Sequence, residues 1–123
     1  MGLLVDGIWH EDWYDTEKSD GRFERFESTF RNWITIDGEP GPTGRGGFKA
    51  APGRYHLYVA DSCPWAHRTL IYRKLKGLED IVSIADALKH PRGWHFRESE
   101  GLIPDFVNGA THMHEIYTKA EPE

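Results

Sequence analysis

The chain contains one cysteine, Cys63, in the stretch SCPWAHRTLIYRKLKG, directly before a proline. A cysteine ahead of a helix that begins at Pro64 lies where unpaired backbone N–H groups and the positive end of the helix dipole converge. This position favours the thiolate, which is the nucleophilic form of cysteine. From its position alone, Cys63 could equally be a buried side chain with only a packing role, because free cysteine is also among the most buried residue types.

The spacing around the cysteine limits the disulfide chemistry that is open to it. Ala66 stands where a Cys-x-x-Cys motif has its second cysteine, so any disulfide of Cys63 must form with another molecule. The sequence therefore predicts a monothiol site. Pro64 costs no hydrogen bond at the first helical position and makes the turn rigid.

Two other groups of residues offer weaker candidates. Trp94, in RGWHF, could stack on a flat ligand, although packing is the commoner role of a large aromatic side chain. His112 and His114 form an HMH pair, but one cysteine and no matching carboxylate spacing make a zinc site improbable. We therefore expect no metal.

Composition and charge exclude several classes of protein. The 20 acidic residues outnumber the 15 Lys and Arg, for a net charge of −5, and no basic stripe is visible, so nucleic-acid binding is not expected. The apolar runs are too short for a membrane span. The first residues, MGLLVDGIWHEDW, do not form a secretory signal, and a single cysteine suits a reducing cytoplasm.

The elements that position Cys63 are predicted on both sides of it. Alternation in RYHLYVA, residues 54–60, indicates a β-strand, and the helix that follows extends from Pro64 to about Lys76, with Gly77 as its stop. Its apolar stripe is expected to contain Leu70, Ile71, Leu75 and Leu78. DIVSIA, residues 80–85, indicates a second strand. Strand, helix and strand in this order predict a βαβ unit with parallel strands.

The rest of the chain divides into an arm and the end of a domain. Residues 1–53 are expected to form an extended, aromatic and Gly/Pro-rich arm, whose segment GEPGPTGRGGFKAAPG reads as a long loop. We expect its aromatic residues to anchor it on the folded body: Trp9, Trp13, Tyr14, Phe23, Phe26, Phe30, Trp33 and Phe48. Residues 54–123 are expected to form one partial domain, loop-like after Ala85, with a short helix in THMHEIYTKAEPE.

Longer strings in the sequence resemble one known family. The strings YHLYV, CPWAHRTLI, RKLKGLE and GWHF resemble the glutathionyl-hydroquinone reductases, the Xi class of glutathione transferases. DGIWHEDWYDT, FRNWI and GEPGPTGRGGF resemble the extended N-terminal arm of that family. The resemblance implies an α/β fold, the thioredoxin-like N-terminal half of a glutathione transferase. The helical C-terminal domain of the family has no counterpart in these residues.

The resemblance also implies a reaction and its residues. In that family a monothiol cysteine, matched here by Cys63, attacks the sulfur of a glutathionyl-hydroquinone and forms a mixed disulfide with glutathione. A second glutathione then releases the enzyme, so glutathione is a co-substrate. The match implies that Trp94 lies over bound glutathione and that Pro64 belongs to the same binding region. Full-length members could form homodimers.

Two departures leave other functions open. Asp61 places a negative charge near the cysteine, and the chain ends at IYTKAEPE, before the Val-Pro and Glu-Ser motifs that hold glutathione in the family. The chain could therefore be a truncated, non-catalytic fragment that acts through a partner. An omega-like thiol transferase or dehydroascorbate reductase would share the cysteine but not the arm.

Overall fold

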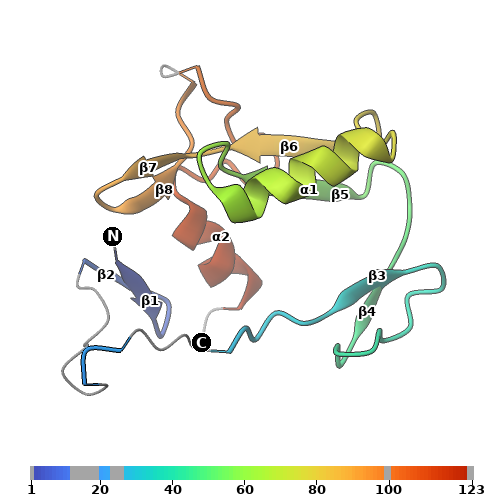
Figure 1. Ribbon diagram of the computed structural model, residues 1–123, viewed down its shortest axis with the longest axis horizontal. Helices are drawn as coiled ribbons and strands as arrows, with labels where there is room; N and C mark the ends of the chain where they lie inside the picture. The colour runs from blue at the N-terminus through green and yellow to red at the C-terminus, as the bar shows by residue number, and fades with distance from the viewer. Residues whose placement is uncertain (1, 12–19, 23–26, 99–100, 122–123) are drawn as a thin grey trace.

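Ten short elements make up the fold in a computed structural model, which describes residues 2–11, 20–22, 27–98 and 101–121. The elements are β1 (Leu3–Val5), β2 (Ile8–His10), β3 (Trp33–Thr35), β4 (Gly47–Lys49), β5 (Tyr55–Val59), α1 (Pro64–Leu75), β6 (Val82–Asp86), β7 (Leu88–His90), β8 (Gly93–His95) and α2 (Met113–Ala120). The strands form pairs, and each pair is a sheet of two strands. Figure 1 shows β5, α1 and β6 together, with the β7–β8 hairpin and α2 beside them.

The predicted βαβ unit is confirmed. β5 and β6 are parallel and in register from Tyr55 opposite Val82 to Val59 opposite Asp86, and α1 connects them. Val59 is almost completely buried, with 1% of its surface exposed. The buried hydrophobic core at this sheet is small and consists of Ala60, Ala85, Ala87 and Phe96.

Helix α1 ends at Leu75, two residues before Gly77, the glycine that was predicted to stop it. Gly77 has φ +63°, a left-handed conformation that glycine adopts without strain. Its N–H donates to the carbonyl of Lys74, and the N–H of Leu78 donates to the carbonyl of Arg73, which together form a Schellman motif. The Arg73 side chain then donates to the carbonyl of Val82 at 2.6 Å. The end of α1 is thereby attached to the start of β6.

The apolar stripe predicted for α1 is only partly covered, since Leu70 and Leu78 are half-buried while the rest of it is exposed. No residue of α1 is buried, and Ile71 and Leu75 are 46% and 75% exposed. Arg73 binds the neighbouring backbone through its side chain, so polar bonds as well as apolar packing hold the helix to the sheet.

The region after Ala85 contains more regular structure than expected. β7 and β8 form an antiparallel hairpin, with His90 opposite Gly93, where a loop-like segment was predicted. Gly93 has φ +98°, which only glycine adopts readily, so the glycine that suggested a loop closes a tight turn between strands. The helix predicted near the end is confirmed as α2.

The arm also contains strands that the sequence did not predict. β1 and β2 form a hairpin, and β4 pairs in parallel with β3 inside the segment expected to be only loop. A Cβ on Gly47 would collide with the carbonyls of Gly38 and Glu39, so this glycine lets the backbones approach closely. Side-chain bonds hold the connection, among them Trp33 Nε1 to Thr43 Oγ1 at 2.8 Å.

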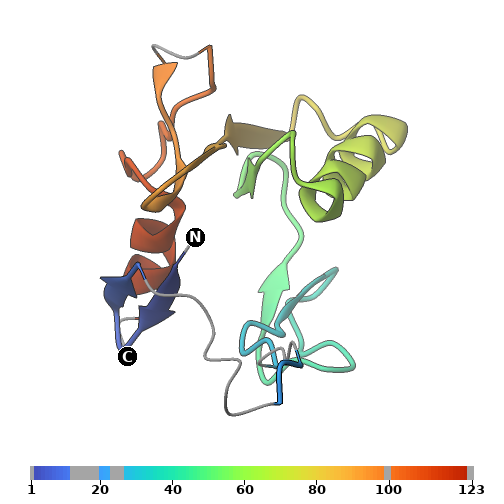
Figure 2. The same ribbon diagram turned by 60° about the vertical axis from the view of Figure 1, so that its left-hand side comes forward.

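The two parts of the arm differ in what they pack against. The β1–β2 hairpin lies beside α2, whereas the β3–β4 pair lies on the opposite side of the molecule (Figure 2). Trp9 of β2 is partly buried, but Trp33 and Phe48 of the second pair are 46% and 45% exposed. The anchoring role predicted for the arm aromatics thus fits Trp9 and not these two.

Four of the aromatic residues in that prediction lie outside the described residues, so nothing follows for them: Trp13, Tyr14, Phe23 and Phe26. Within the described ranges, no helix is long and apolar enough to span a bilayer.

Candidate functional site: a thiol at a helix N-terminus

Cys63 is the N-cap residue of α1, and Pro64 is the first residue of the helix. The Cys63 backbone is extended, with φ −94° and ψ 112°, as is usual for an N-cap. Its N–H donates to the carbonyl of Ala60, and its carbonyl accepts from the N–H of His67, both at 2.9 Å. The side chain, which makes no capping bond, is half-buried at the positive end of the helix dipole.

A cavity of about 640 Å³ opens beside this thiol, and we call it the thiol cavity. It is lined by Phe30, Tyr58, Val59, Ala60, Cys63, Ala66, Trp94, Met113, Ile116, Tyr117 and Ala120. Cys63 and Trp94 therefore share one cavity, although 31 positions separate them in the sequence. Pro64 is exposed at the start of α1 and is not among these lining residues.

No charged side chain belongs to this lining. The walls are aromatic and aliphatic, and the polar groups among them are the thiol, the Tyr58 and Tyr117 hydroxyls and the indole of Trp94. Such a surface suits the apolar body of a substrate held next to the sulfur. The described residues of the lining offer no partner for a carboxylate or an ammonium group.

The Tyr58 hydroxyl is fixed by the loop that follows β8. It donates to Asp105 Oδ1 at 3.0 Å and accepts from Asn108 Nδ2 at 2.7 Å. Backbone amides of Val107, Asn108 and Ala110 also donate to the buried Asp105 carboxylate, each at 3.0 Å. Burial alone raises the pKa of Asp105, but these hydrogen bonds outweigh it and lower the pKa below its usual value. One carboxylate thus orders both the loop and one wall of the thiol cavity.

Two carboxylates lie at the loop before Cys63. The N–H of Asp61 donates to Asp86 Oδ1 at 3.2 Å, and Asp61 itself is exposed. Partial burial raises the pKa of Asp86, and the charge of Asp61 adds to that effect. The negative charge expected from Asp61 is present at this loop and is opposed, on the other side of the cysteine, by the helix dipole.

Two basic residues follow the cysteine in α1, His67 and Arg68, and neither lines the thiol cavity. The Arg68 guanidinium lies 4.6 Å from the ring centroid of Trp65, in a cation–π arrangement on the outer face of α1. His67 is exposed. The positive potential at the thiol therefore comes from the helix end rather than from a contacting side chain.

Sequence reasoning missed most of the cavity wall. Met113, Ile116, Tyr117 and Ala120 come from one face of α2, with the spacing of an amphipathic helix. That spacing was visible in the sequence. What was not visible was that α2 packs against β8 and lines the same cavity as Cys63, because only the tertiary fold brings residues this far apart in the chain together.

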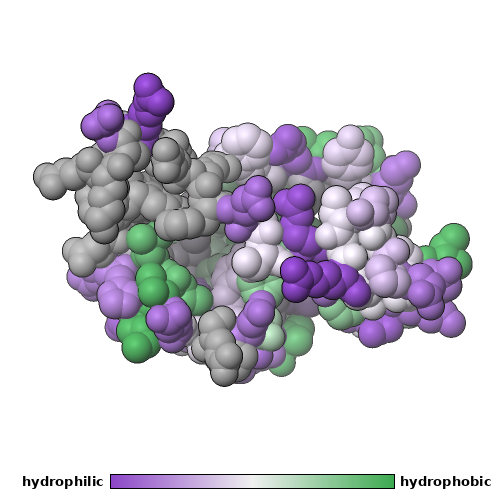
Figure 3. All heavy atoms as spheres, turned by 90° about the horizontal axis from the view of Figure 1, so that it is seen from below, coloured by the Kyte–Doolittle hydropathy of each residue, from purple (hydrophilic) through white to green (hydrophobic). Residues whose placement is uncertain are grey.

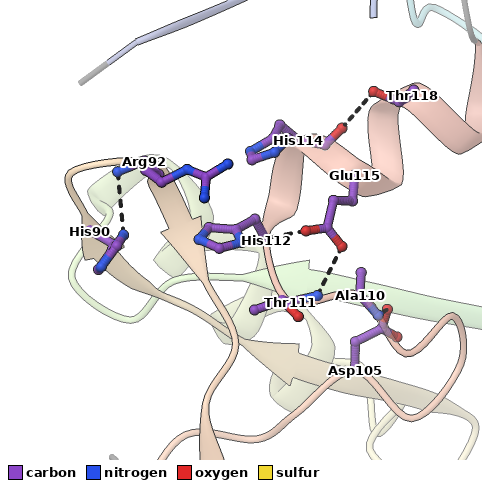
Figure 4. Close-up of polar contacts among 9 residues, drawn as sticks. All are labelled: His90, Arg92, Asp105, Ala110, Thr111, His112, His114, Glu115 and Thr118. Carbon is purple, nitrogen blue, oxygen red and sulfur yellow. Dashed lines mark hydrogen bonds and ion pairs between the residues drawn. The ribbon is translucent and has the colours of Figure 1, made fainter. Parts of the chain in front are cut away.

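Histidine rings form a second cluster, next to α2. The rings of His112 and His114 are 5.3 Å apart, and the ring of His90 lies 5.7 Å from that of His112 (Figure 4). Glu115 pairs with His112 at 3.4 Å and accepts from the N–H of Thr111. Across the described ranges, no three His, Cys, Asp or Glu side chains are arranged to hold a metal ion.

Comparison with known proteins places this fold. No family model matches the chain. The glutathione-bound structure of YqjG from Escherichia coli superposes with a TM-score of 0.78 and 44% identity, over 98% of this chain and 34% of that one. The Xi-class glutathione transferase of Natrialba magadii gives 0.75 and 39%, over 100% and 35%. The fold around Cys63 is therefore part of a glutathione transferase fold.

Sequence comparison defines the class more narrowly. The chain is 51% identical to the glutathionyl-hydroquinone reductase YqjG of Escherichia coli, over 99% of this chain and 38% of that protein. It is 45% identical to PcpF, the glutathionyl-hydroquinone reductase of Sphingobium chlorophenolicum, over 99% and 36%. Over nearly its whole length the chain is similar to glutathionyl-hydroquinone reductases and to Xi-class glutathione transferases, and it spans little more than a third of the length of these relatives.

Proposed function

We propose that this chain carries the nucleophilic thiol of a glutathione-dependent reductase that removes glutathione from glutathionyl-hydroquinones, with Cys63 as the nucleophile. The observation that carries this proposal is the position of Cys63 at the N-terminus of α1, open to a cavity that Trp94 also lines. The names of two relatives, both glutathionyl-hydroquinone reductases, support the substrate class. We place the reaction in the cytoplasm, where glutathione keeps thiols reduced.

In the first step the Cys63 thiolate attacks the sulfur of the conjugate. A bond forms between the two sulfur atoms, and the bond between the glutathione sulfur and the aromatic carbon breaks. The aromatic carbon takes the electron pair and a proton, so the hydroquinone leaves reduced and Cys63 is left in a mixed disulfide with glutathione. The helix dipole stabilises the attacking thiolate.

In the second step a second glutathione, as its thiolate, attacks the glutathione sulfur of the mixed disulfide. Oxidised glutathione leaves, and Cys63 becomes a thiolate again. A cysteine whose thiolate is stabilised is also the better leaving group, so one position serves both steps. The balance is one conjugate and one glutathione consumed for one hydroquinone and one oxidised glutathione.

The binding roles of Trp94 and Pro64 are part of the same proposal. The Trp94 ring lines the thiol cavity, where its flat face is available to the glutathione that is joined to Cys63. Pro64 sets the turn that presents the sulfur. The thiol cavity lacks charged lining groups, so we assign it the apolar part of the substrate and not the carboxylates of glutathione.

The experiment is turnover of a glutathionyl-hydroquinone with excess glutathione, followed by chromatography of the released hydroquinone. We expect release by the wild-type chain and none above background by Cys63→Ser, with oxidised glutathione formed in equal amount. Cys63→Ser removes the nucleophile at nearly constant volume, so its circular dichroism spectrum serves as the folding control. Equal release by both proteins would contradict the role of Cys63.

A second function has one observation in its favour. The outer face of α1 carries exposed apolar side chains, with Trp65 at 63% and Leu75 at 75% exposed, which fits a non-catalytic fragment that associates with a partner. In that case the chain forms a mixed disulfide with oxidised glutathione but releases no hydroquinone from a glutathionyl-hydroquinone. Homodimerisation belongs with this proposal and is tested by sedimentation of the same sample.

A further inference from the structure

A second cavity, of about 550 Å³, lies between the N-terminal hairpin and α2, and we call it the arm cavity. Leu4, Asp6 and Trp9 line it from the hairpin, and His114, Tyr117 and Glu121 line it from the region of α2. Cys63 does not line it. Seen from below, apolar side chains gather on the side that carries the hairpin in Figure 1 (Figure 3).

The walls of the arm cavity are shaped to hold a flat ring. Trp9 stacks on His114 with 4.9 Å between ring centroids and an angle of 21° between the planes. Its six-membered ring lies against Gly93, where a Cβ would come within 3.0 Å of Trp9 Cη2. Phe30 and Tyr117, whose ring centroids are 5.5 Å apart, form another part of the wall. Aromatic surfaces of this kind pack well against planar ligands.

Two polar atoms of these walls lack a partner within the described part of the chain. Trp9 Nε1 and His114 Nδ1 are both buried there without a hydrogen bond. An indole N–H can only donate, whereas a neutral imidazole nitrogen can accept. Burial lowers the pKa of His114, with His112 adding to the effect, so the ring is neutral at pH 7. A hydroxyl group can accept from the first atom and donate to the second.

The charges at this cavity favour a neutral ligand. Asp6 and Glu121 belong to the lining, and no Lys or Arg of the described residues does. The thiol cavity next to it has no charged lining group. Both carboxylates are exposed, and because like charges repel, an anion is disfavoured in the arm cavity relative to a neutral molecule of the same shape.

We propose that the arm cavity is a separate binding site for a neutral, planar aromatic alcohol, held against Trp9, His114 and Tyr117 with its hydroxyl at the two buried nitrogens. The cavity volume is within the range of small-molecule sites, and its aromatic walls with a few polar atoms match their usual composition. The proposal does not rest on the proposed function, because Cys63 takes no part in this cavity.

The test is calorimetric titration with 2-naphthol, which is neutral at pH 7, and with 2-naphthoate, its anionic counterpart. We expect one site for 2-naphthol, equal in affinity in the wild type and in Cys63→Ser, and about tenfold weaker binding of 2-naphthoate. Absence of 2-naphthol binding, its loss in Cys63→Ser, or equal affinity for the two probes would overturn the proposal.

Conservative variants make the test independent of folding. Trp9→Phe keeps a ring and removes the N–H, and we expect 2-naphthol affinity to fall about three- to tenfold. The matched control is Trp65→Phe on the outer face of α1, which lines neither cavity and is expected to leave affinity unchanged. The double variant Asp6→Asn, Glu121→Gln is expected to raise the affinity for 2-naphthoate close to the affinity for 2-naphthol. Asn suits position 6, where φ is +48°. Equal effects of Trp9→Phe and Trp65→Phe would also contradict the site.

Discussion

The thiol cavity and the arm cavity share part of their walls but differ in their chemistry. Phe30, Trp94, Met113 and Tyr117 line both. Among the described residues, one side has a thiol with uncharged lining neighbours, and the other has two carboxylates and two buried nitrogens without partners. The thiol of Cys63 and the arm cavity therefore lie side by side but depend on different segments of the chain, the start of α1 for the thiol and the β1–β2 hairpin for the arm cavity.

The largest expected effect separates the two cavities completely. Cys63→Ser removes the only thiol of the chain, so we expect reaction with oxidised glutathione to disappear. The arm cavity should keep its affinity for 2-naphthol, because Cys63 does not line it. Mass spectrometry and calorimetry on one sample measure both. Loss of both properties would mean that the two cavities are one site.

A change in the shared wall should affect both cavities. Trp94 packs against the core cluster and lines each cavity, so we expect Trp94→Ala to slow adduct formation at Cys63 and to weaken 2-naphthol binding. It should also lower the free energy of unfolding by about 2–4 kcal/mol, somewhat below the cost for a fully buried aromatic residue. Urea unfolding gives the stability, and an effect on one cavity alone would contradict the shared wall.

The support behind the thiol cavity can be weakened without touching the thiol. Asp105→Asn replaces one acceptor oxygen by an amide that cannot accept from the surrounding N–H groups, and we expect a loss of about 1–3 kcal/mol in the free energy of unfolding. Because its pKa is lowered on folding, Asp105 stabilises the wild type above its unfolded pKa of about 3.9 and loses this contribution as pH falls through the folded value.

The control for Asp105 is the pH dependence itself. Urea midpoints at pH 6 and pH 3 should differ more for the wild type than for Asp105→Asn. If the two proteins lose stability in parallel, other carboxylates account for the acid sensitivity. The arm cavity should keep its 2-naphthol affinity in this variant, since Asp105 contacts Tyr58 of the other cavity.

The smallest expected effect concerns the arm side. Burial lowers the pKa of His114, and the charges of His112 and Arg92 add to the lowering, while Glu115 and a hydrogen bond to the Arg92 backbone oppose it. A neutral His114 therefore stabilises the fold fully above its unfolded pKa of about 6.5 and loses this contribution as pH falls through the folded value. We expect the melting temperature to fall between pH 7.5 and 5.5, and to fall less in His114→Gln. An equal fall in both proteins would assign the dependence to other groups.

Local patterns in the sequence predicted the segment that carries the thiol. Alternation from Tyr55, Pro64 at the helix start and Gly77 at its end each act within a few residues, so β5, α1 and β6 could be placed before the structure was seen. The position of Cys63 at the N-cap follows from the same signals. These elements depend on short-range steric and hydrogen-bonding rules.

The same rules misled where a glycine serves a long-range contact. Gly47 and Gly93 lie in segments that were predicted to be loops. Gly47 instead lets β4 pair with β3, and Gly93 lies at the turn that connects β7 and β8, against the Trp9 ring. The strands around them have three residues each, too few for an alternating pattern to be recognised. The arm cavity could not be predicted, because it exists only where the hairpin meets α2.

The central claim is that Cys63 is a nucleophile toward glutathione sulfur. Its most direct test is the intact mass of the wild-type chain after incubation with oxidised glutathione at neutral pH, followed by peptide mapping. We expect a gain of one glutathione, located on the peptide that contains Cys63 and removed by a reducing agent. An unchanged mass on a chain whose circular dichroism shows it to be folded would contradict the account.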